Sequence, residues 1–330
     1  MAPISEVPGI DDVADAAARI DGVAVRTPLL ESAALNDLVG GRLLIKAEML
    51  QVTGSFKFRG AYNRISRLDE AARQAGVIAF SSGNHAQGVA AAAHLAGAPA
   101  VIVMPDDAPR VKREGTERWG AEIVTYDRRD HDARETIAAE IMSVRGGTLV
   151  PPYDDAHIIA GQGTVGLELV AQAADCDARP DAVLAPCGGG GLTAGIATAV
   201  SAQLPDCAIH TVEPAGFDDT ARSLAAGERL DIDPAATSFC DALLAPRPGE
   251  LTFAINSRLV KSGLVVDDNE AAAAMRALFT HLKLVAEPGG AVAVAAVLSG
   301  QFDCRGKTVC AVASGGNVDP GTFCDALDAA

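Results

Sequence analysis

Lys57 stands between two phenylalanines in the segment Gly54-Ser55-Phe56-Lys57-Phe58-Arg59-Gly60-Ala61. A lysine in a partly desolvated pocket loses its proton more easily and becomes a nucleophilic amine, which can form a Schiff base with an aldehyde. Taken alone, the pattern also suits a solvated lysine at the edge of an amphipathic strand or helix. Lys57 is therefore a candidate catalytic residue whose role depends on the segments around it.

A second candidate is a run of four glycines that follows an apolar stretch at 182–185 and precedes a helical stretch at 192–198. The run consists of Gly188, Gly189, Gly190 and Gly191. Glycines let successive N–H groups converge on an anion, and the amino end of a helix adds a favourable dipole. A phosphate group suits this loop better than a flexible turn, because flexible linkers seldom join a buried strand to a helix.

The glycine run has an alternative use as a dinucleotide fingerprint. Thr193 stands where the third glycine of that fingerprint is required, which weakens the match. Glu213, about 20 residues farther on, could mimic the acid that binds a ribose in such proteins. Lys57 and Ser314 have no role in that scheme, so a nicotinamide oxidoreductase is a distant alternative.

Two further segments place hydroxyl and amide groups just after apolar runs. They are Ser81-Ser82-Gly83-Asn84-His85, and Ser314-Gly315-Gly316-Asn317. The first joins a strand to a helix, so its hydroxyls, amide and unpaired N–H groups could bind a second anion. An ordinary helix cap fits that segment equally well. A strand-end turn is the plain interpretation of the second.

These four segments occur in an order that resembles the fold-type II pyridoxal-phosphate enzymes of the serine/threonine dehydratase and serine racemase family. The resemblance extends from Arg26-Thr27-Pro28-Leu29 to Asn317, nearly the whole chain. It implies a two-domain α/β fold of the tryptophan synthase β type, with parallel sheets flanked by helices. It also implies an active site in the cleft between the domains.

The resemblance assigns roles to these segments. Lys57 would carry pyridoxal 5′-phosphate as a Schiff base and, once displaced by the substrate, remove the substrate's α-proton. The glycine run would bind the cofactor phosphate. The substrate α-carboxylate would be held by Ser81, Ser82, Gly83, Asn84 and His85. Asn84 would also contact the cofactor's 3′ oxygen.

Ser314 would hydrogen-bond the pyridine nitrogen of the cofactor. A hydroxyl partner leaves that nitrogen largely unprotonated, which favours prompt loss of a β-leaving group. Phe56 would pack near the cofactor ring, and Glu287, in Glu287-Pro288-Gly289-Gly290, would lie near the pyridine edge. Ser82 matches the opposite-face base of serine racemase, but the same serine occurs in dehydratases and does not separate the two activities.

The segment Glu213-Pro214-Ala215-Gly216-Phe217-Asp218-Asp219 contains separated carboxylates and intervening carbonyls. These are hard oxygen ligands suited to Mg²⁺ or Ca²⁺. The segment is similar to the cation site of serine racemase, where the ligands would map to Glu213, the Phe217 carbonyl and Asp219. A solvated acidic turn is the alternative.

The composition argues against several classes of partner. Lys and Arg number 27 and Asp and Glu 43, so the formal net charge of −16 repels phosphate backbones and anionic membrane surfaces. Seven scattered cysteines without a Cys-x-x-Cys pair suggest neither a disulfide framework nor a zinc site. There is no long apolar run and no secretory pattern at the N-terminus. We therefore predict a soluble cytoplasmic protein without nucleic-acid or membrane partners.

The elements expected to position these segments repeat one pattern: an apolar strand, a turn of small residues, and an Ala-rich helix. Three such units begin at 76–80, 100–104 and 121–126. They predict a small parallel α/β domain over about 76–153.

Further apolar runs at 182–185, 209–212 and 307–312 predict a second, larger α/β domain. The family resemblance adds the N-terminal residues to it. The large cofactor-binding domain would then comprise 1–75 and 154–330, with 76–153 inserted.

We predict a pyridoxal-phosphate-dependent ammonia-lyase that converts L-threonine or L-serine into 2-oxobutyrate or pyruvate plus ammonia, as a homodimer or homotetramer. Serine racemase and 3-hydroxyaspartate dehydratase are alternatives on the same scaffold, and a catalytically silent binding protein is a distant one. No lysine or arginine lies in the segment 81–85. Because a second substrate carboxylate would need a cationic partner, L-threonine and L-serine are expected to exceed 3-hydroxyaspartate as substrates.

Overall fold

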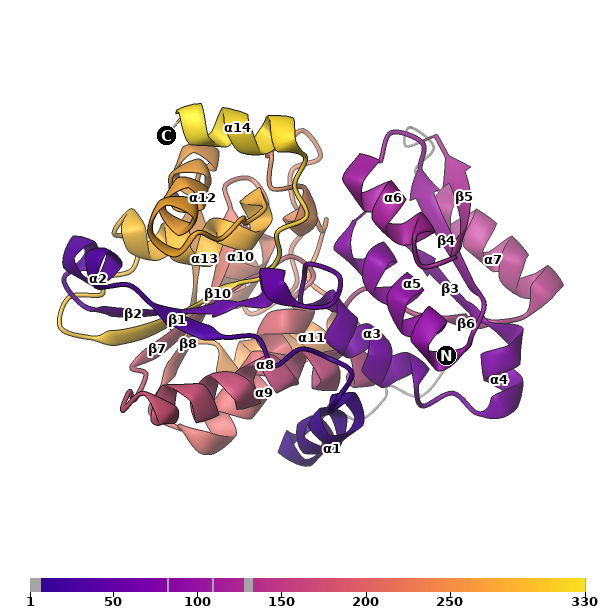
Figure 1. Ribbon diagram of the computed structural model, residues 1–330, viewed down its shortest axis with the longest axis horizontal. Helices are drawn as coiled ribbons and strands as arrows, with labels where there is room; N and C mark the ends of the chain where they lie inside the picture. The colour runs from indigo at the N-terminus through magenta and orange to yellow at the C-terminus, as the bar shows by residue number, and fades with distance from the viewer. Residues whose placement is uncertain (1–6, 82, 109, 128–132, 330) are drawn as a thin grey trace.

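The computed structural model describes residues 7–81, 83–108, 110–127 and 133–329. Its strands form two sheets, one of six strands and one of four. Figure 1 shows the sheets in two lobes with helix α3 (Lys57–Ile65) between them. All strands but one are parallel to their neighbours and helices flank both sheets, so the predicted α/β class is confirmed.

The six-stranded sheet has the order β1-β2-β10-β7-β8-β9, with only the edge strand β1 antiparallel. Its central strands are nearly continuous apolar runs, as expected where helices cover both faces. In β10, for example, every residue from 309 to 313 is buried. The strands are β1 (Leu29–Glu31), β2 (Arg42–Ala47), β7 (Ala182–Pro186), β8 (Ala208–Pro214), β9 (Ser262–Val266) and β10 (Thr308–Ala313).

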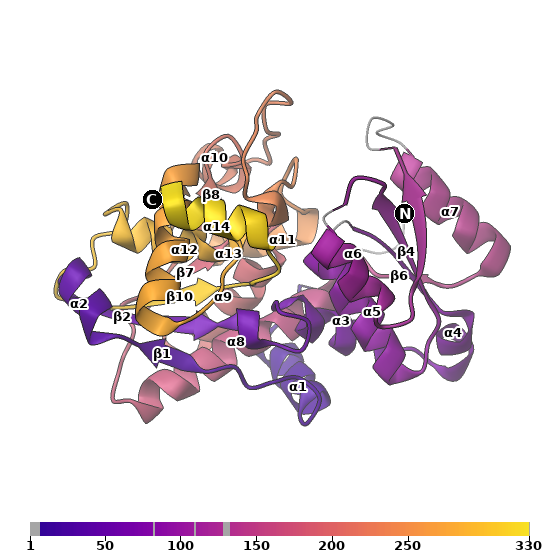
Figure 2. The ribbon, with the colours of Figure 1, turned by 45° about the horizontal axis from the view of Figure 1, so that its top comes forward.

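Two layers of helices enclose this sheet. Leu43 and Ile45 of β2 pack into the apolar cluster shared with α2, α12, α13 and α14, whereas Leu44 faces the cluster of α8 and α9. Figure 1 shows α12, α13 and α14 above the strands and α8 and α9 below them, and Figure 2 shows the same layers with the top of the molecule turned forward. These helices are α1 (Ile10–Ile20), α2 (Ala33–Val39), α8 (Ala156–Asp175), α9 (Gly191–Gln203), α12 (Asp268–Leu282), α13 (Pro288–Leu298) and α14 (Pro320–Ala329).

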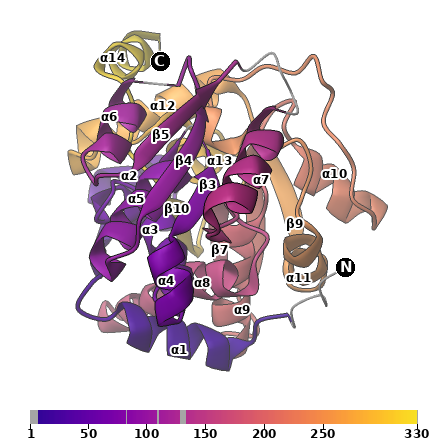
Figure 3. The ribbon, with the colours of Figure 1, turned by 90° about the vertical axis from the view of Figure 1, so that its right-hand side faces the viewer.

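The four-stranded sheet is fully parallel, in the order β5-β4-β3-β6. Ala79 and Ile102 face α5, and Ile78 and Val103 face α7, so this sheet also lies between helices (Figure 3). Its strands are β3 (Val77–Phe80), β4 (Ala100–Pro105), β5 (Glu122–Tyr126) and β6 (Thr148–Leu149), and its helices α4 (Glu70–Ala75), α5 (Asn84–Ala96), α6 (Arg110–Glu117) and α7 (Ala133–Arg145).

The predicted segments lie just beyond the carboxyl ends of parallel strands. Ser81 follows β3, the glycine run follows β7, and Ser314 follows β10. Ligands bind at this edge in open α/β sheets. The remaining helices near this edge are the short 3-10 turns η1 (Glu48–Leu50) and η2 (Asp241–Leu243), with α10 (Asp219–Ala226) and α11 (Glu250–Leu259).

Helix α3 begins at the same edge. The Phe56 N–H donates to the Ser314 carbonyl at 3.1 Å, and Ser55 forms an isolated antiparallel bridge with Gly315. These contacts hold Lys57, the first residue of α3, beside the end of β10. None of the described helices is long and apolar enough to cross a bilayer.

Candidate active site

Lys57 lies on the wall of a cavity of about 190 Å³ between the two lobes. Its Nζ donates to the Pro152 carbonyl at 2.7 Å and lies 5.2 Å from the centre of the Phe56 ring. Burial lowers the pKa of Lys57 to about 8, although the Glu287 carboxylate partly opposes the fall. An appreciable share of this amine is therefore unprotonated near neutral pH, as a nucleophile or base requires.

The glycine run forms another wall of the cavity. Gly190 has φ +92°, in the left-handed region that glycine tolerates, and a Cβ on Gly189 would overlap the ring of Tyr153. No described residue accepts a hydrogen bond from the N–H groups of Gly188, Gly189 or Gly190. At the start of α9 the first N–H groups also lack partners within the helix. The loop therefore presents several donors to one anion.

The substrate-loop residues reach the same cavity. Ser81, Gly83, Asn84 and His85 line it, whereas Ser82 lies outside the described residues. Gly83 precedes α5, so the amino end of that helix faces the cavity with the positive end of its dipole. This placement suits a carboxylate.

His85 is held neutral. Its Nε2 lies 2.9 Å from the Val150 carbonyl, which can only accept, so Nε2 carries the proton. Burial, together with the charge of Lys57, lowers the pKa of His85 to about 3. His85 thus offers no positive charge to a ligand at neutral pH.

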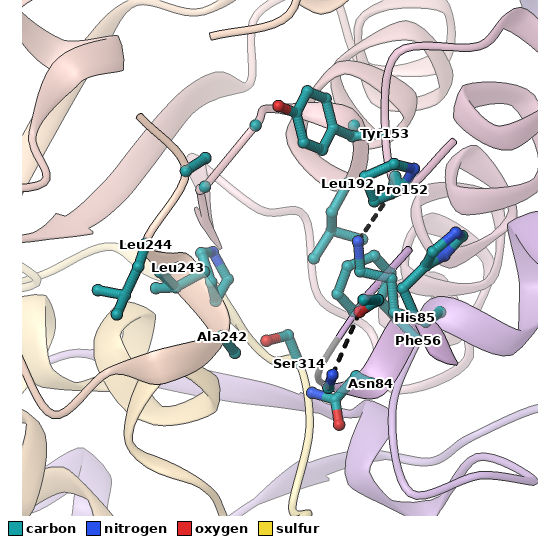
Figure 4. Close-up of a pocket in the computed structure, with 18 of the residues that line it drawn as sticks. Phe56, Asn84, His85, Pro152, Tyr153, Leu192, Ala242, Leu243, Leu244 and Ser314 are labelled. Atoms are coloured by element: carbon teal, nitrogen blue, oxygen red, sulfur yellow. Dashed lines mark hydrogen bonds between the residues drawn. The ribbon is translucent and has the colours of Figure 1, made fainter. Parts of the chain in front are cut away.

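Ser314 and Phe56 complete the part of the cavity nearest β10. Ser314 is 6% exposed and its N–H donates to the Gly290 carbonyl at 3.1 Å. Figure 4 shows Phe56, His85 and Asn84 on one side of the cavity, Ala242 and Leu243 on the other, and Ser314 between them. Phe56 and Ser314 therefore both face the space in which a cofactor ring would be held.

Asn84 is oriented by a network that crosses between the lobes. Its Nδ2 donates to Glu287 Oε1, and its Oδ1 accepts from Asn317 Nδ2 at 2.8 Å. Glu287 does not line the cavity but lies behind Asn84, almost fully buried. Lys112 of α6 lies 3.2 Å from Glu287 Oε2 and donates to Asp241 Oδ2 at 2.6 Å.

This network joins one ammonium, that of Lys112, to two carboxylates, those of Glu287 and Asp241. Burial raises the pKa of Glu287, and the Lys112 ammonium opposes that rise. Burial also lowers the pKa of Lys112, but Glu287 and Asp241 outweigh it, so the net pKa is raised. Lys112 is therefore a cation enclosed by carboxylates at the cavity wall.

Sequence reasoning missed several residues of this wall. They are Lys112, Pro152, Tyr153, and residues 241–245. The run Pro152-Tyr153-Asp154-Asp155 precedes a long helical segment, and its aromatic residue beside two prolines could have marked it as a turn at the site. Lys112 gives no such local signal, because Arg110 and Arg113 flank it in the same charged helix.

The predicted cation ligands lie apart from the cavity, where β8 ends and α10 begins. Both Glu213 oxygens accept N–H groups of α10, from Thr220 at 2.9 Å and Ala221 at 2.7 Å. Asp219 is fully buried, and neither of its carboxylate oxygens has a hydrogen-bond partner among the described residues. Phe217 is buried beside them.

Burial disfavours the charged forms of both Glu213 and Asp219. Burial raises the pKa of Asp219 to about 7, and burial followed by the Asp219 charge raises the pKa of Glu213 well above its ordinary value. A cation would relieve this, and the orphaned Asp219 oxygens fit one. Among the described residues, those of this segment included, no three or more His, Cys, Asp or Glu side chains converge as metal ligands, so a cation here would depend on the two carboxylates and backbone oxygens.

Comparison with known proteins identifies the family. A family model described as "Pyridoxal-phosphate dependent enzyme" matches residues 20–315. The chain belongs to this family. The expected fold type is confirmed by solved structures: a threonine deaminase from T.th. is 45% identical with a TM-score of 0.89, covering 94% of this chain and 99% of that one.

Curated relatives of this pyridoxal-phosphate-dependent enzyme carry different activities. An L-threo-3-hydroxyaspartate ammonia-lyase from a Pseudomonas species is 44% identical, over 93% of this chain and 95% of that protein. A serine racemase from Schizosaccharomyces pombe is 39% identical, over 95% of each. The chain is thus a member of the ammonia-lyase and racemase group, and the names of the relatives leave its substrate open.

The cavity fits pyridoxal phosphate on its own geometry. The N–H groups of the glycine run without acceptors suit the phosphate, and Lys57 supplies the amine that would bind the aldehyde. Asn84 and Ser314 line the same cavity and would supply polar groups to the cofactor ring. The individual site assignments remain predictions.

Proposed function

We propose that this enzyme is an ammonia-lyase that removes the β-hydroxyl and the amino group of L-threonine or L-serine. The products are 2-oxobutyrate or pyruvate, each with one ammonia. When bound, pyridoxal phosphate withdraws electrons from the substrate Cα and so acidifies its proton. The chain must then hold the substrate carboxylate, accept the α-proton and protect the site from water.

In this proposal Lys57 accepts the α-proton. Its amine lies on the cavity wall with a pKa of about 8, and the Pro152 carbonyl holds it in position. The amino end of α5 takes the α-carboxylate through Ser81, Gly83 and the Asn84 and His85 region. The apolar residues 242–245 line the opposite side of the cavity, where Leu243 is buried and Leu244 is exposed.

The observation that carries the choice of substrate is the charge of the described cavity wall. Its lysines are Lys57, committed to the reaction, and Lys112, already enclosed by Asp241 and Glu287. A second substrate carboxylate would have to displace Asp241 from Lys112 and would then face Glu287. A neutral β-substituent avoids this conflict, which favours L-threonine and L-serine.

A second candidate substrate is L-threo-3-hydroxyaspartate. The 44% identical relative bears that name, and Lys112 is a cation that a β-carboxylate could reach by exchange with Asp241. The two candidates differ in the group on the β-carbon, a methyl group or hydrogen in one and a carboxylate in the other, so the charge of the pocket bears directly on the choice.

A substrate panel tests the proposal. We expect kcat/KM for L-threonine or L-serine to exceed that for L-threo-3-hydroxyaspartate, with the threonine methyl worth about 1–3 kcal/mol either way. Release of 2-oxo acid and ammonia, and the D-serine formed from L-serine, are measured on the same preparation. A tenfold or greater preference for hydroxyaspartate would establish the second candidate, and D-serine as the main product would establish a racemase.

We also propose that Glu213, Asp219 and the Phe217 carbonyl bind Mg²⁺ or Ca²⁺. A ligand bound only by the folded state raises stability by mass action, so either cation should raise the melting temperature and EDTA should reverse the rise. The double variant Glu213→Gln, Asp219→Asn should abolish the response. If the wild-type protein melts at one temperature with cation and with chelator, the segment is only a buried acidic turn.

A further inference from the structure

Behind the glycine run lies a pair of buried polar residues on one face of α11. Thr252 and Asn256 are four residues apart, so they project side by side, and they are 0% and 1% exposed. The Thr252 hydroxyl donates to the Gly189 carbonyl at 2.7 Å, and the Gly249 N–H donates to the same oxygen at the longer distance of 3.3 Å. Asn256 Nδ2 lies 3.4 Å from the Gly190 carbonyl.

Helix α11 lies on the side of the loop away from the cavity. Residues 188–192 line the cavity, but neither Thr252 nor Asn256 does. A Cβ on Gly190 would come within 2.9 Å of Asn256 and 3.0 Å of Thr252, so the two side chains pack directly against the back of the loop.

Because the peptide bond is planar, the contact between Thr252 and the Gly189 carbonyl also sets the direction of the Gly190 N–H. In a trans peptide the C=O of one residue and the N–H of the next point in opposite directions. With the Gly189 carbonyl fixed toward Thr252, the N–H of Gly190 must point away from α11, toward the cavity. Asn256 contributes less to the orientation of the Gly190 carbonyl, because that carbonyl also accepts the Ala194 N–H of α9 at 2.9 Å.

Helix α11 is itself fixed to the other wall of the cavity. The Asp154 carboxylate accepts the N–H groups of Glu250 and Leu251 at 2.9 Å and of Thr252 at 3.2 Å. Asp154 lies two residues beyond Pro152, whose carbonyl accepts from Lys57. Helix α11 therefore connects the glycine run, which it contacts through Thr252, to the segment whose Pro152 carbonyl holds Lys57.

We propose that Thr252 is a positioning residue that aims the Gly190 N–H at the cofactor phosphate. This rests on the proposed role of the glycine run. Without the hydroxyl, the Gly189 carbonyl keeps only the longer hydrogen bond from the Gly249 N–H at 3.3 Å, so the peptide between Gly189 and Gly190 is held less firmly. The hydrogen bond from the Gly190 N–H to the phosphate is then less well aligned, while the ring and aldehyde contacts are unaffected.

The test compares two probes that differ only in the phosphate. Full-length protein freed of cofactor is titrated with pyridoxal 5′-phosphate and with pyridoxal, for wild type and Thr252→Val. We expect the wild type to prefer the phosphorylated probe strongly, and Thr252→Val to reduce that preference about tenfold while the Kd for pyridoxal stays unchanged. Inorganic phosphate should also raise the melting temperature of the variant less than that of wild type.

Matched variants separate this role from a structural one. Thr252→Ser keeps the hydroxyl and should retain the wild-type preference. Thr198→Val removes a hydroxyl that donates to a helix carbonyl elsewhere on α9 and should have no effect on the ratio. Thr252→Ala takes the place of Thr252→Val if the latter does not fold.

Each outcome is decisive. Equal weakening of both probes, or an unchanged preference, would reject the positioning role of Thr252 and leave the glycine run as the phosphate site. A wild-type protein that binds both probes equally would reject the phosphate assignment of the glycine run, and the inference with it.

Discussion

Lys57→Ala is expected to reduce ammonia release from the best substrate on the order of a thousandfold or more, because in the proposed function Lys57 supplies both the amine that holds the cofactor and the base for the α-proton. Affinity for the cofactor phosphate should largely survive, since the glycine run is separate from Lys57. Steady-state kinetics, with absorbance to follow the covalently held cofactor, measure the two effects independently.

The pH dependence follows from the pKa of Lys57, which burial lowers to about 8. In cofactor-free protein the unprotonated amine becomes the major form as the pH rises through that value, so labelling of Lys57 by an amine reagent should rise there, well below the range of an ordinary lysine. Lys307→Ala is the matched control for the labelling experiment. Lys307 also lies 5.2 Å from the centre of a phenylalanine ring, but its side chain is exposed. Turnover that survives in Lys57→Ala would overturn the assignment.

Several strands could be predicted from the sequence because a short run rich in apolar residues stands before a turn of small residues. The runs at 182–185, 209–212 and 307–312 became β7, β8 and β10 because helices bury both faces of each strand. Strand β2 was not predicted, since Lys46 and Arg42 break its apolar pattern. Lys46 is nevertheless fully buried, paired with Glu168 at 2.6 Å. Glu168 is more than a hundred residues away in the sequence, so the residues around Lys46 do not indicate that Lys46 is buried and paired.

The same limit applies to the site. Lys57, the glycine run and Ser314 could be found because each combines an unusual local composition with a strand end, and the structure places them around one cavity. Lys112 and Thr252 could not, because their roles depend on partners in distant segments: Asp241 for the first and Gly189 for the second. Local sequence specifies the groups that face a ligand, and packing specifies the groups that hold them.

Lys112→Met is expected to lower both the free energy of unfolding and the activity of the enzyme. Lys112 and Glu287 are 2% and 1% exposed, so removing the ammonium leaves a buried carboxylate without its cation. Breaking such a pair typically costs about 3–5 kcal/mol in unfolding free energy. The substitution should also displace Asn84, which donates to Glu287, and so lower kcat/KM. Chemical denaturation and steady-state kinetics measure the two losses.

The destabilisation should depend on pH in a defined direction. Burial raises the pKa of Glu287 in the wild type despite Lys112, and loss of Lys112 must raise it further. A carboxyl whose folded pKa is raised binds its proton more readily when folded, so its contribution to stability falls as the pH rises above the unfolded value near 4.5. The stability difference between wild type and Lys112→Met should therefore be small near pH ~5 and larger near pH ~8.

A second substitution distinguishes this electrostatic cause from a packing defect. The groups that face Glu287 are Lys112 of α6, Asn84 of α5, Asp241 of η2 and the more distant Lys57 of α3. In the Lys112→Met background, Glu287→Gln removes the uncompensated charge while keeping an amide next to Asn84. It should restore most of the lost stability and abolish the pH dependence of the difference. Equal instability of the single and double variants at every pH would instead assign the loss to the packing of the Lys112 side chain.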